Sequence, residues 1–144
     1  MPSWPRSKKT RKTPPVLVAD DLLMDVTNLD TVPSFFTKDG SEIRELLAHR
    51  NSVIRNQSLA EARLAPGAST QEHYHRVTEE IYYITQGIGR IRIGNDSRDV
   101  KPGDAIAIPP GTRHKLWNTG PEVLRLLCCC APPYEHDDTV MTEP

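Results

Sequence analysis

Apolar residues recur in short runs through the second half of the chain, and glycine or proline closes most of these runs. Residues 90–93 alternate strictly between arginine and isoleucine, which is the two-residue period of a half-buried β-strand. Such runs return at intervals of about 8 to 12 residues, a spacing that favours an all-β sandwich or barrel. The strands expected on this basis are 58–64, 81–85, 90–93, 105–108, 114–117 and 123–131.

The first half of the chain gives weaker signals. Residues 16–30 have a mixed pattern that suggests a strand and a turn. Residues 34–37 suggest a short strand, and the turn residues at 38–41 predict a hairpin there. Residues 42–49 fit either a helix, because of their acids and leucines, or a strand, because turn signals flank them.

The three cysteines are consecutive, at Cys128, Cys129 and Cys130. If Arg125 faces outward from a strand, Cys128 and Cys130 point inward and serve as small apolar side chains. Adjacent cysteines lie on opposite faces of a strand and cannot hold one ion together. The three form no disulfide framework and no spaced zinc motif, so we expect a reducing, cytoplasmic compartment.

Size and charge narrow the function classes. A chain of 144 residues with 13 prolines predicts one main domain built from short elements. The net charge of −1 gives no general reason to expect nucleic acid or a membrane as a partner, and no apolar run is long enough for a membrane span or a signal peptide. We expect a disordered basic arm over 1–15, an N-terminal extension over 16–57, a barrel over 58–131 and a polar, solvated tail over 132–144.

The side chains that could bind a metal ion together lie between residues 73 and 114. His73 and His75 are two residues apart, so on a strand both side chains leave the same face, about 6 to 7 Å apart. On a helix they would point to different sides and could not share one ion. Glu80 and His114 add a carboxylate and a third imidazole, and only a closed barrel of strands would bring all four together.

Two motifs in this region resemble those of the cupin family. The first is Gly67-x5-His73-x-His75-x4-Glu80-x6-Gly87. The second is Gly103-x5-Pro109-x-Gly111-x2-His114-x3-Asn118, which agrees with the cupin motif at every fixed position. The resemblance covers about residues 58–131, and the short segment 88–102 between the motifs is similar to that of small single-domain cupins, described as mannose-6-phosphate isomerase-like or oxalate-decarboxylase-like.

The resemblance implies a double-stranded antiparallel β-helix, a jelly-roll barrel that binds one divalent metal ion inside one end. It places the ligands on His73, His75, Glu80 and His114. Imidazole and carboxylate ligands suit manganese or iron, with zinc, nickel, cobalt and copper as alternatives. Four such ligands close a tetrahedral zinc site but leave two adjacent positions of an octahedral site open. The resulting charge of about +1 favours a chelating anion, such as a dicarboxylate, an α-keto acid, an enediolate or a catecholate.

Several other residues are candidates for the substrate pocket. Gln71 shares a strand face with His73, and Tyr82 shares one with Glu80, so each lines the pocket, supports a ligand or belongs to the core. Arg63 either reaches an anionic substrate or is solvated. Residues 134–138 either close over the barrel mouth or belong to the solvated tail.

The motifs indicate a broad class of function and not one specific reaction. We expect a metal-dependent enzyme of the dioxygenase, decarboxylase or isomerase type, or alternatively a non-catalytic module that binds or senses a sugar or organic acid. Glu72 and Glu79 point away from the cluster by strand parity, so no general acid or base stands beside it. This absence favours a reaction in which the metal does most of the work, such as O2 activation. Tyr83 and Trp117 are expected to face outward and to suit a homodimer.

Overall fold

The computed structural model describes residues 24–143. The expected basic arm at 1–15 lies outside the described residues, as does most of the segment 16–30. Within residues 24–30 the chain is extended and irregular until the 3-10 helix η1 (Leu29–Thr31), so the strand expected there does not form in its described part. In the described part of the chain, no helix is long and apolar enough to cross a bilayer.

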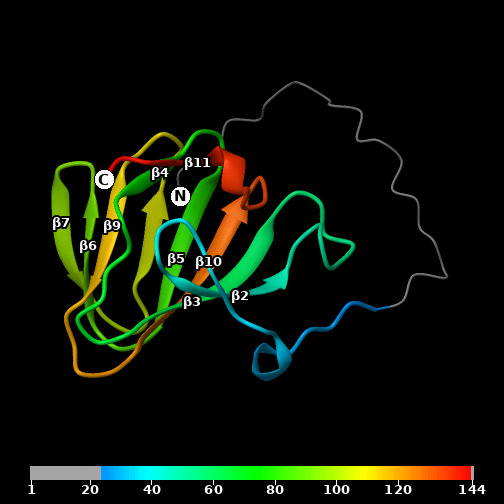
Figure 1. Ribbon diagram of the computed structural model, residues 1–144, viewed down its shortest axis with the longest axis horizontal. Coiled ribbons are helices and arrows are strands. Elements are labelled where there is room, and N and C mark those ends of the chain that lie inside the picture. The colour runs from blue at the N-terminus through cyan, green and yellow to red at the C-terminus, as the bar shows by residue number, and fades with distance from the viewer. Residues whose placement is uncertain (1–23, 144) are drawn as a thin grey trace, which may run out of the picture.

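Two antiparallel sheets make up most of the described part of the chain (Figure 1). One sheet has six strands in the order β1 (Phe35–Phe36), β2 (Glu42–Leu47), β3 (Ser58–Leu64), β10 (Leu124–Ala131), β5 (Glu79–Gln86) and β8 (Ala105–Ile108). The other has five, in the order β11 (Thr139–Met141), β4 (His73–His75), β9 (His114–Asn118), β6 (Gly89–Ile93) and β7 (Asp96–Val100).

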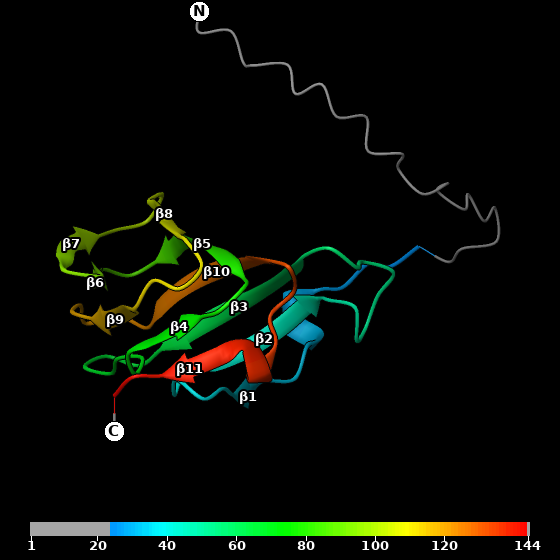
Figure 2. The ribbon, with the colours of Figure 1, turned by 90° about the horizontal axis from the view of Figure 1, so that it is seen from above.

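The two sheets curve around a shared interior, so the fold is a jelly-roll barrel, as expected (Figure 2). Buried and exposed residues alternate along β5 and β10, because successive side chains of a strand point to opposite faces. The core between the sheets contains Ile84, Leu116, Leu124 and Leu126, which are at most 1% exposed. Burial of each such side chain stabilises the fold by roughly 1.5–3 kcal/mol.

Of the two alternatives for residues 42–49, the structure has the strand. Strand β2 covers Glu42–Leu47 and pairs with both β1 and β3. Strand β7 was not predicted. Its residues are polar apart from Val100, so it lacks the alternation that reveals a strand, and its pairing with β6 defines it instead.

The segment after Pro132 is not a solvated tail. It forms the 3-10 helix η2 (His136–Asp138) and then β11, which pairs with β4. Two cations of the N-terminal extension hold this segment in place. Lys38 Nζ donates to the carbonyl oxygens of His136 and Thr139, both at 3.1 Å. Arg50 donates to the carbonyl of Tyr134 at 2.9 Å and to Glu135 at 3.2 Å. Residues 38 and 50 of the N-terminal extension therefore contact the C-terminal segment that pairs with β4.

Candidate metal centre

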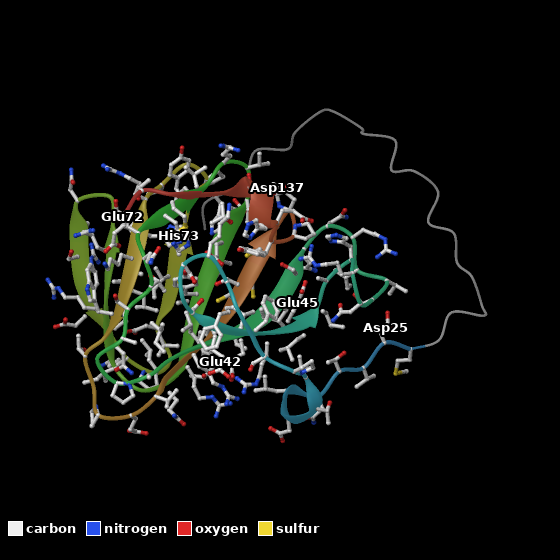
Figure 3. All side chains as sticks on the ribbon, viewed as in Figure 1. Asp25, Glu42, Glu45, Glu72, His73 and Asp137 are labelled. Carbon is white, nitrogen blue, oxygen red and sulfur yellow. The ribbon has the colours of Figure 1, made fainter. Side chains whose placement is uncertain are left out.

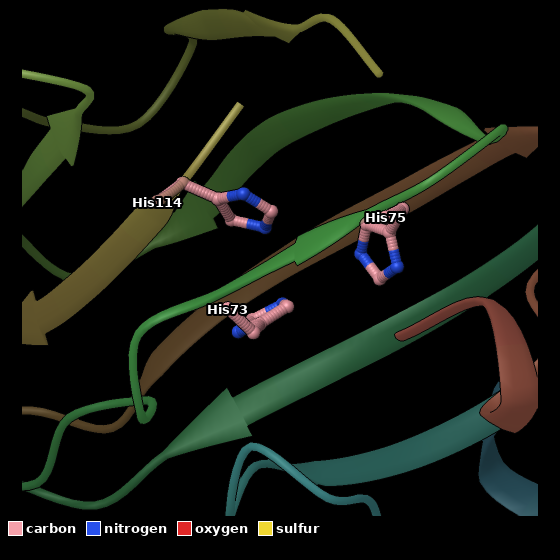
Figure 4. Close-up of side chains that lie close together, drawn as sticks. All are labelled: His73, His75 and His114. Atoms are coloured by element: carbon pink, nitrogen blue, oxygen red, sulfur yellow. The ribbon is translucent and has the colours of Figure 1, made fainter. Parts of the chain in front are cut away.

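Three buried imidazoles meet inside this end of the barrel (Figure 4). His73 and His75 leave the same face of β4, and His114 begins β9, directly opposite His73 in the strand register. The ligand atoms of the three histidines all lie within 4.8 Å of one another, and each residue is at most 3% exposed. The strand geometry expected from the spacing of His73 and His75 is therefore present, and the barrel supplies the third imidazole.

The second nitrogen of each ring has a fixed partner. The Nδ1 atoms of His73 and His114 lie 2.7 and 3.0 Å from the carbonyl oxygens of Gln71 and Thr112. A carbonyl only accepts hydrogen bonds, so both Nδ1 atoms carry the proton. His75 Nδ1 lies 3.1 Å from Thr139 Oγ1.

The Thr139 hydroxyl donates its own proton to the carbonyl of Glu135 at 3.1 Å, so it accepts from His75. In the neutral form all three imidazoles therefore leave Nε2 with a free lone pair, the arrangement found in metal-binding histidines.

Glu80 lies against two of the three imidazoles. Its Oε1 is 3.4 Å from Nε2 of His75 and 3.6 Å from Nε2 of His114, separations too long for hydrogen bonds. Its Oε2 accepts a hydrogen bond from the thiol of Cys130 at 3.1 Å. Burial alone would raise the pKa of Glu80, but the imidazoles of His114 and His75 in their protonated forms outweigh it and hold the pKa well below its ordinary value.

Two atoms at the centre of this cluster lack partners. Glu80 Oε1 and His114 Nε2 are fully buried and have no hydrogen-bond partner in the described chain, a costly state for polar atoms. A carboxylate oxygen facing imidazole lone pairs needs a positive charge between them. The donor set of three nitrogens and one carboxylate oxygen thus fits a divalent transition-metal ion.

Asp39 is a functional candidate that the sequence reasoning missed. It lies in the turn between β1 and β2 and is buried. Its Oδ2 faces the cluster, 3.7 Å from His73 Nε2. The residues Lys38-Asp39-Gly40-Ser41 have the composition of an ordinary hairpin turn, so no sequence signal linked Asp39 to the histidines. Its presence corrects the expectation that no acid stands beside the cluster.

The cluster opens into a cavity with about 50 Å³ of free space. Tyr82 is among the residues that line it, and its phenol is buried, which raises its pKa well above the ordinary value. Phe35 and Tyr134 also line the cavity, so both the N-terminal extension and the segment after Pro132 contribute to its wall. Of the two alternatives for residues 134–138, the structure places Tyr134 at the cavity and His136 on the surface.

Two of the proposed pocket residues are elsewhere. The side chain of Gln71 is exposed and does not line the cavity, although its carbonyl holds His73. Arg63 lies on the outer face of β3, where it pairs with Glu61. Parity explains the arginine: Ala62 and Leu64 take the inner face, so Arg63 between them points outward.

The acids expected to point away from the cluster do so. Glu79 is exposed. Glu72, which is labelled in Figure 3, pairs with Arg92 at 2.6 Å. Of the two aromatic residues expected on the surface, Tyr83 is 43% exposed. Trp117 is half-buried, with the cations of Arg92 and Lys115 at 5.2 and 5.3 Å from its ring.

Comparison with known proteins identifies one matching family model and several similar sequences. A family model described as a cupin domain matches residues 60–130. The uncharacterized protein MJ1618 of Methanocaldococcus jannaschii is 47% identical over 117 residues, which are 81% of this chain and 94% of that protein. The tetracenomycin polyketide synthase protein TcmJ of Streptomyces glaucescens is 28% identical over 109 residues, 74% of this chain and 73% of that protein.

Solved structures share the fold. A predicted oxalate decarboxylase from Thermotoga maritima superposes with a TM-score of 0.66 at 25% identity, over 75% of this chain and 99% of that one. The nucleoside dehydratase Pac13 of Streptomyces superposes with a TM-score of 0.69 at 16% identity, over 84% of this chain and 92% of that one. At that identity the likeness to Pac13 concerns the fold alone.

Proposed function

Because the chain belongs to the cupin family, we propose that His73, His75, Glu80 and His114 hold one divalent metal ion and that the protein is a metal-dependent enzyme. The observation that carries this proposal is the orientation and hydrogen bonding of the three imidazoles. Each Nδ1 is held by an acceptor and each Nε2 turns toward the others. A purely structural barrel has no need of three buried rings arranged in this way.

Manganese or iron fits the proposal best, with zinc, nickel, cobalt and copper as alternatives. A bound ion of this kind would supply Lewis acidity, and a redox-active one would also allow electron transfer. The chain's own groups do the rest. Cys130 and Thr139 hold Glu80 and His75 in position, and the cavity wall, with Tyr82, Phe35 and Tyr134, limits the access of water.

The substrate is proposed to be a small molecule that chelates the ion through two oxygen atoms, since four protein ligands leave two adjacent positions of an octahedral site. A divalent ion, three neutral imidazoles and Glu80 have a net charge of +1, which favoured a chelating anion. The carboxylate of Asp39 cancels this charge, so we propose a chelating substrate without specifying that it is an anion. Dioxygenase, decarboxylase and isomerase chemistry all fit this description.

Elemental analysis of the purified protein tests the metal site directly. We expect close to one transition-metal ion per chain, and its loss in a variant with His73 and His75 replaced by alanine. The metal-loaded protein would then be screened against organic acids, sugar phosphates and catechols, with O2 uptake recorded. Metal-free protein from every preparation would contradict the proposal, whereas tight ligand binding without product would favour the alternative, a module that binds or senses a sugar or organic acid.

We also propose a homodimer that uses the outer face of the six-stranded sheet. Ile81 and Tyr83 are 50% and 43% exposed there, and Leu127, Cys129 and Ala107 flank them in the strand register. An exposed apolar face of this kind is typical of an interface. Light scattering of the wild type and of Tyr83→Glu would test it, since the variant should be monomeric.

The free thiols of Cys128–Cys130 support the expected cytoplasmic location.

A further inference from the structure

Asp39 gives the cavity a hydrogen-bond acceptor that the four proposed metal ligands do not account for. Its Oδ1 accepts three hydrogen bonds, from the Thr37 hydroxyl at 2.7 Å and from the backbone and side chain of Ser41 at 2.9 and 2.6 Å. These donors fix the orientation of the carboxylate. No donor from residues 24–143 reaches its Oδ2, which faces the cavity near His73.

The cavity is acidic apart from its imidazoles. Asp39, Glu45 and Glu80 line it, and among its described lining residues there is no lysine or arginine. Glu45 lies toward the mouth, where Arg50 pairs with it at 3.1 Å. With neutral imidazoles, the charges of Asp39 and Glu80 cancel those of a divalent ion. A dianion would therefore enter a site of no net positive charge and approach an unpaired carboxylate, which is unfavourable at low effective dielectric.

Resting on the proposed function, we infer that this centre selects a neutral chelator with a hydroxyl next to a carbonyl over a dicarboxylate, and that Asp39 Oδ2 accepts the hydrogen bond of that hydroxyl. The hydroxyl and the carbonyl oxygen would both bind the ion, and Asp39 would distinguish the hydroxyl from a second carboxylate. The small free space of about 50 Å³, roughly three to five water-sized positions, limits the chelating part to a few heavy atoms.

Two probes of similar size separate the alternatives. Oxalate is a dianion without a hydroxyl. Acetohydroxamic acid is neutral in solution and has a hydroxyl on the atom next to its carbonyl carbon; the proton that its chelation would otherwise release is retained in the hydrogen bond to Asp39 Oδ2. Both would be titrated calorimetrically into Mn(II)-loaded protein, with Mn(II) content and its electron paramagnetic resonance spectrum recorded first. We expect the wild type to bind acetohydroxamic acid at least about tenfold more tightly than oxalate. In Asp39→Asn the preference should reverse, with acetohydroxamic acid weakened about tenfold and oxalate strengthened about tenfold.

Glu42→Gln is the matched control, because it removes the same charge from β2 at a residue that does not line the cavity and that Arg44 already pairs at 3.0 Å. Both affinities should then stay within about threefold of wild type. Tighter oxalate binding by the wild type overturns the inference, and this comparison needs no variant to fold. Parallel weakening of both probes in Asp39→Asn overturns it as well, because it would indicate a structural role. Wild-type protein that retains no Mn(II) before any probe is added overturns the proposed function itself.

Discussion

Thr139→Val would test whether β11 takes part in the metal centre. Thr139 is buried, accepts a hydrogen bond from His75 Nδ1 and donates one to the carbonyl of Glu135, both at 3.1 Å. Valine keeps the shape and the strand preference but has no hydroxyl. The Nδ1–H of a 3%-exposed histidine then loses its partner, and the imidazole is free to rotate or to move its proton to Nε2.

The size of the effect follows from these contacts. A buried donor left without a partner costs about 1–3 kcal/mol. For a domain of this size, a loss of about 2 kcal/mol lowers Tm by about 4–8 °C. Loss of the group that orients a metal-binding histidine usually lowers metal affinity about 10- to 100-fold. We therefore expect a modest fall in the Tm of the metal-free protein and a 10- to 100-fold weaker affinity for Mn(II), measured by competition with a chelator.

Thr142→Val is the matched control, since the Thr142 hydroxyl donates to Glu72 on the exposed side of the same segment, at 2.9 Å. Its affinity for Mn(II) should equal that of the wild type. The reasoning would be refuted if Thr139→Val lowered Tm but left the metal affinity within about threefold of wild type, because Thr139 would then contribute only to packing.

Three further predictions concern the same centre. His114→Ala should fold, by circular dichroism, because the hydrophobic core does not include His114, but it should lose most of its bound metal; unchanged metal content would remove His114 from the site. Burial lowers the pKa of His73, and the nearby His114 lowers it further by a smaller amount. At a pH between the ordinary value of about 6.5 and the lower value in the folded protein, only the unfolded chain binds the proton. Urea unfolding of the metal-free protein should thus show stability falling as pH drops below about 6.5, and a slope unchanged by His73→Gln would contradict this. Cys130→Ala removes the donor to Glu80 Oε2 and should weaken metal binding about tenfold, whereas Cys130→Ser should retain it; equal losses would mean that the volume of the thiol matters and not its hydrogen bond.

The sequence alone determined the barrel and the cluster at its centre. Alternation along segments such as 90–93 and the inward parity of Cys128 and Cys130 were correct, because the side-chain direction of a strand is a local property of the backbone. The same rule put His73 and His75 on one face and turned Glu79 outward. The family motifs then joined His114 to this pair across the chain, which no local rule could do.

Only the tertiary structure decided what else surrounds the cluster. Asp39 comes from a turn and Thr139 from a polar segment, and neither has a local pattern that points to a metal centre. They reach it because the β1–β2 hairpin continues one sheet beside β3 and β11 continues the other beside β4, a strand distant from it in sequence. Arg63, a candidate for the substrate pocket, instead pairs with Glu61 on the outer face of β3. Such pairings depend on contacts between separate segments, so only the folded chain reveals them.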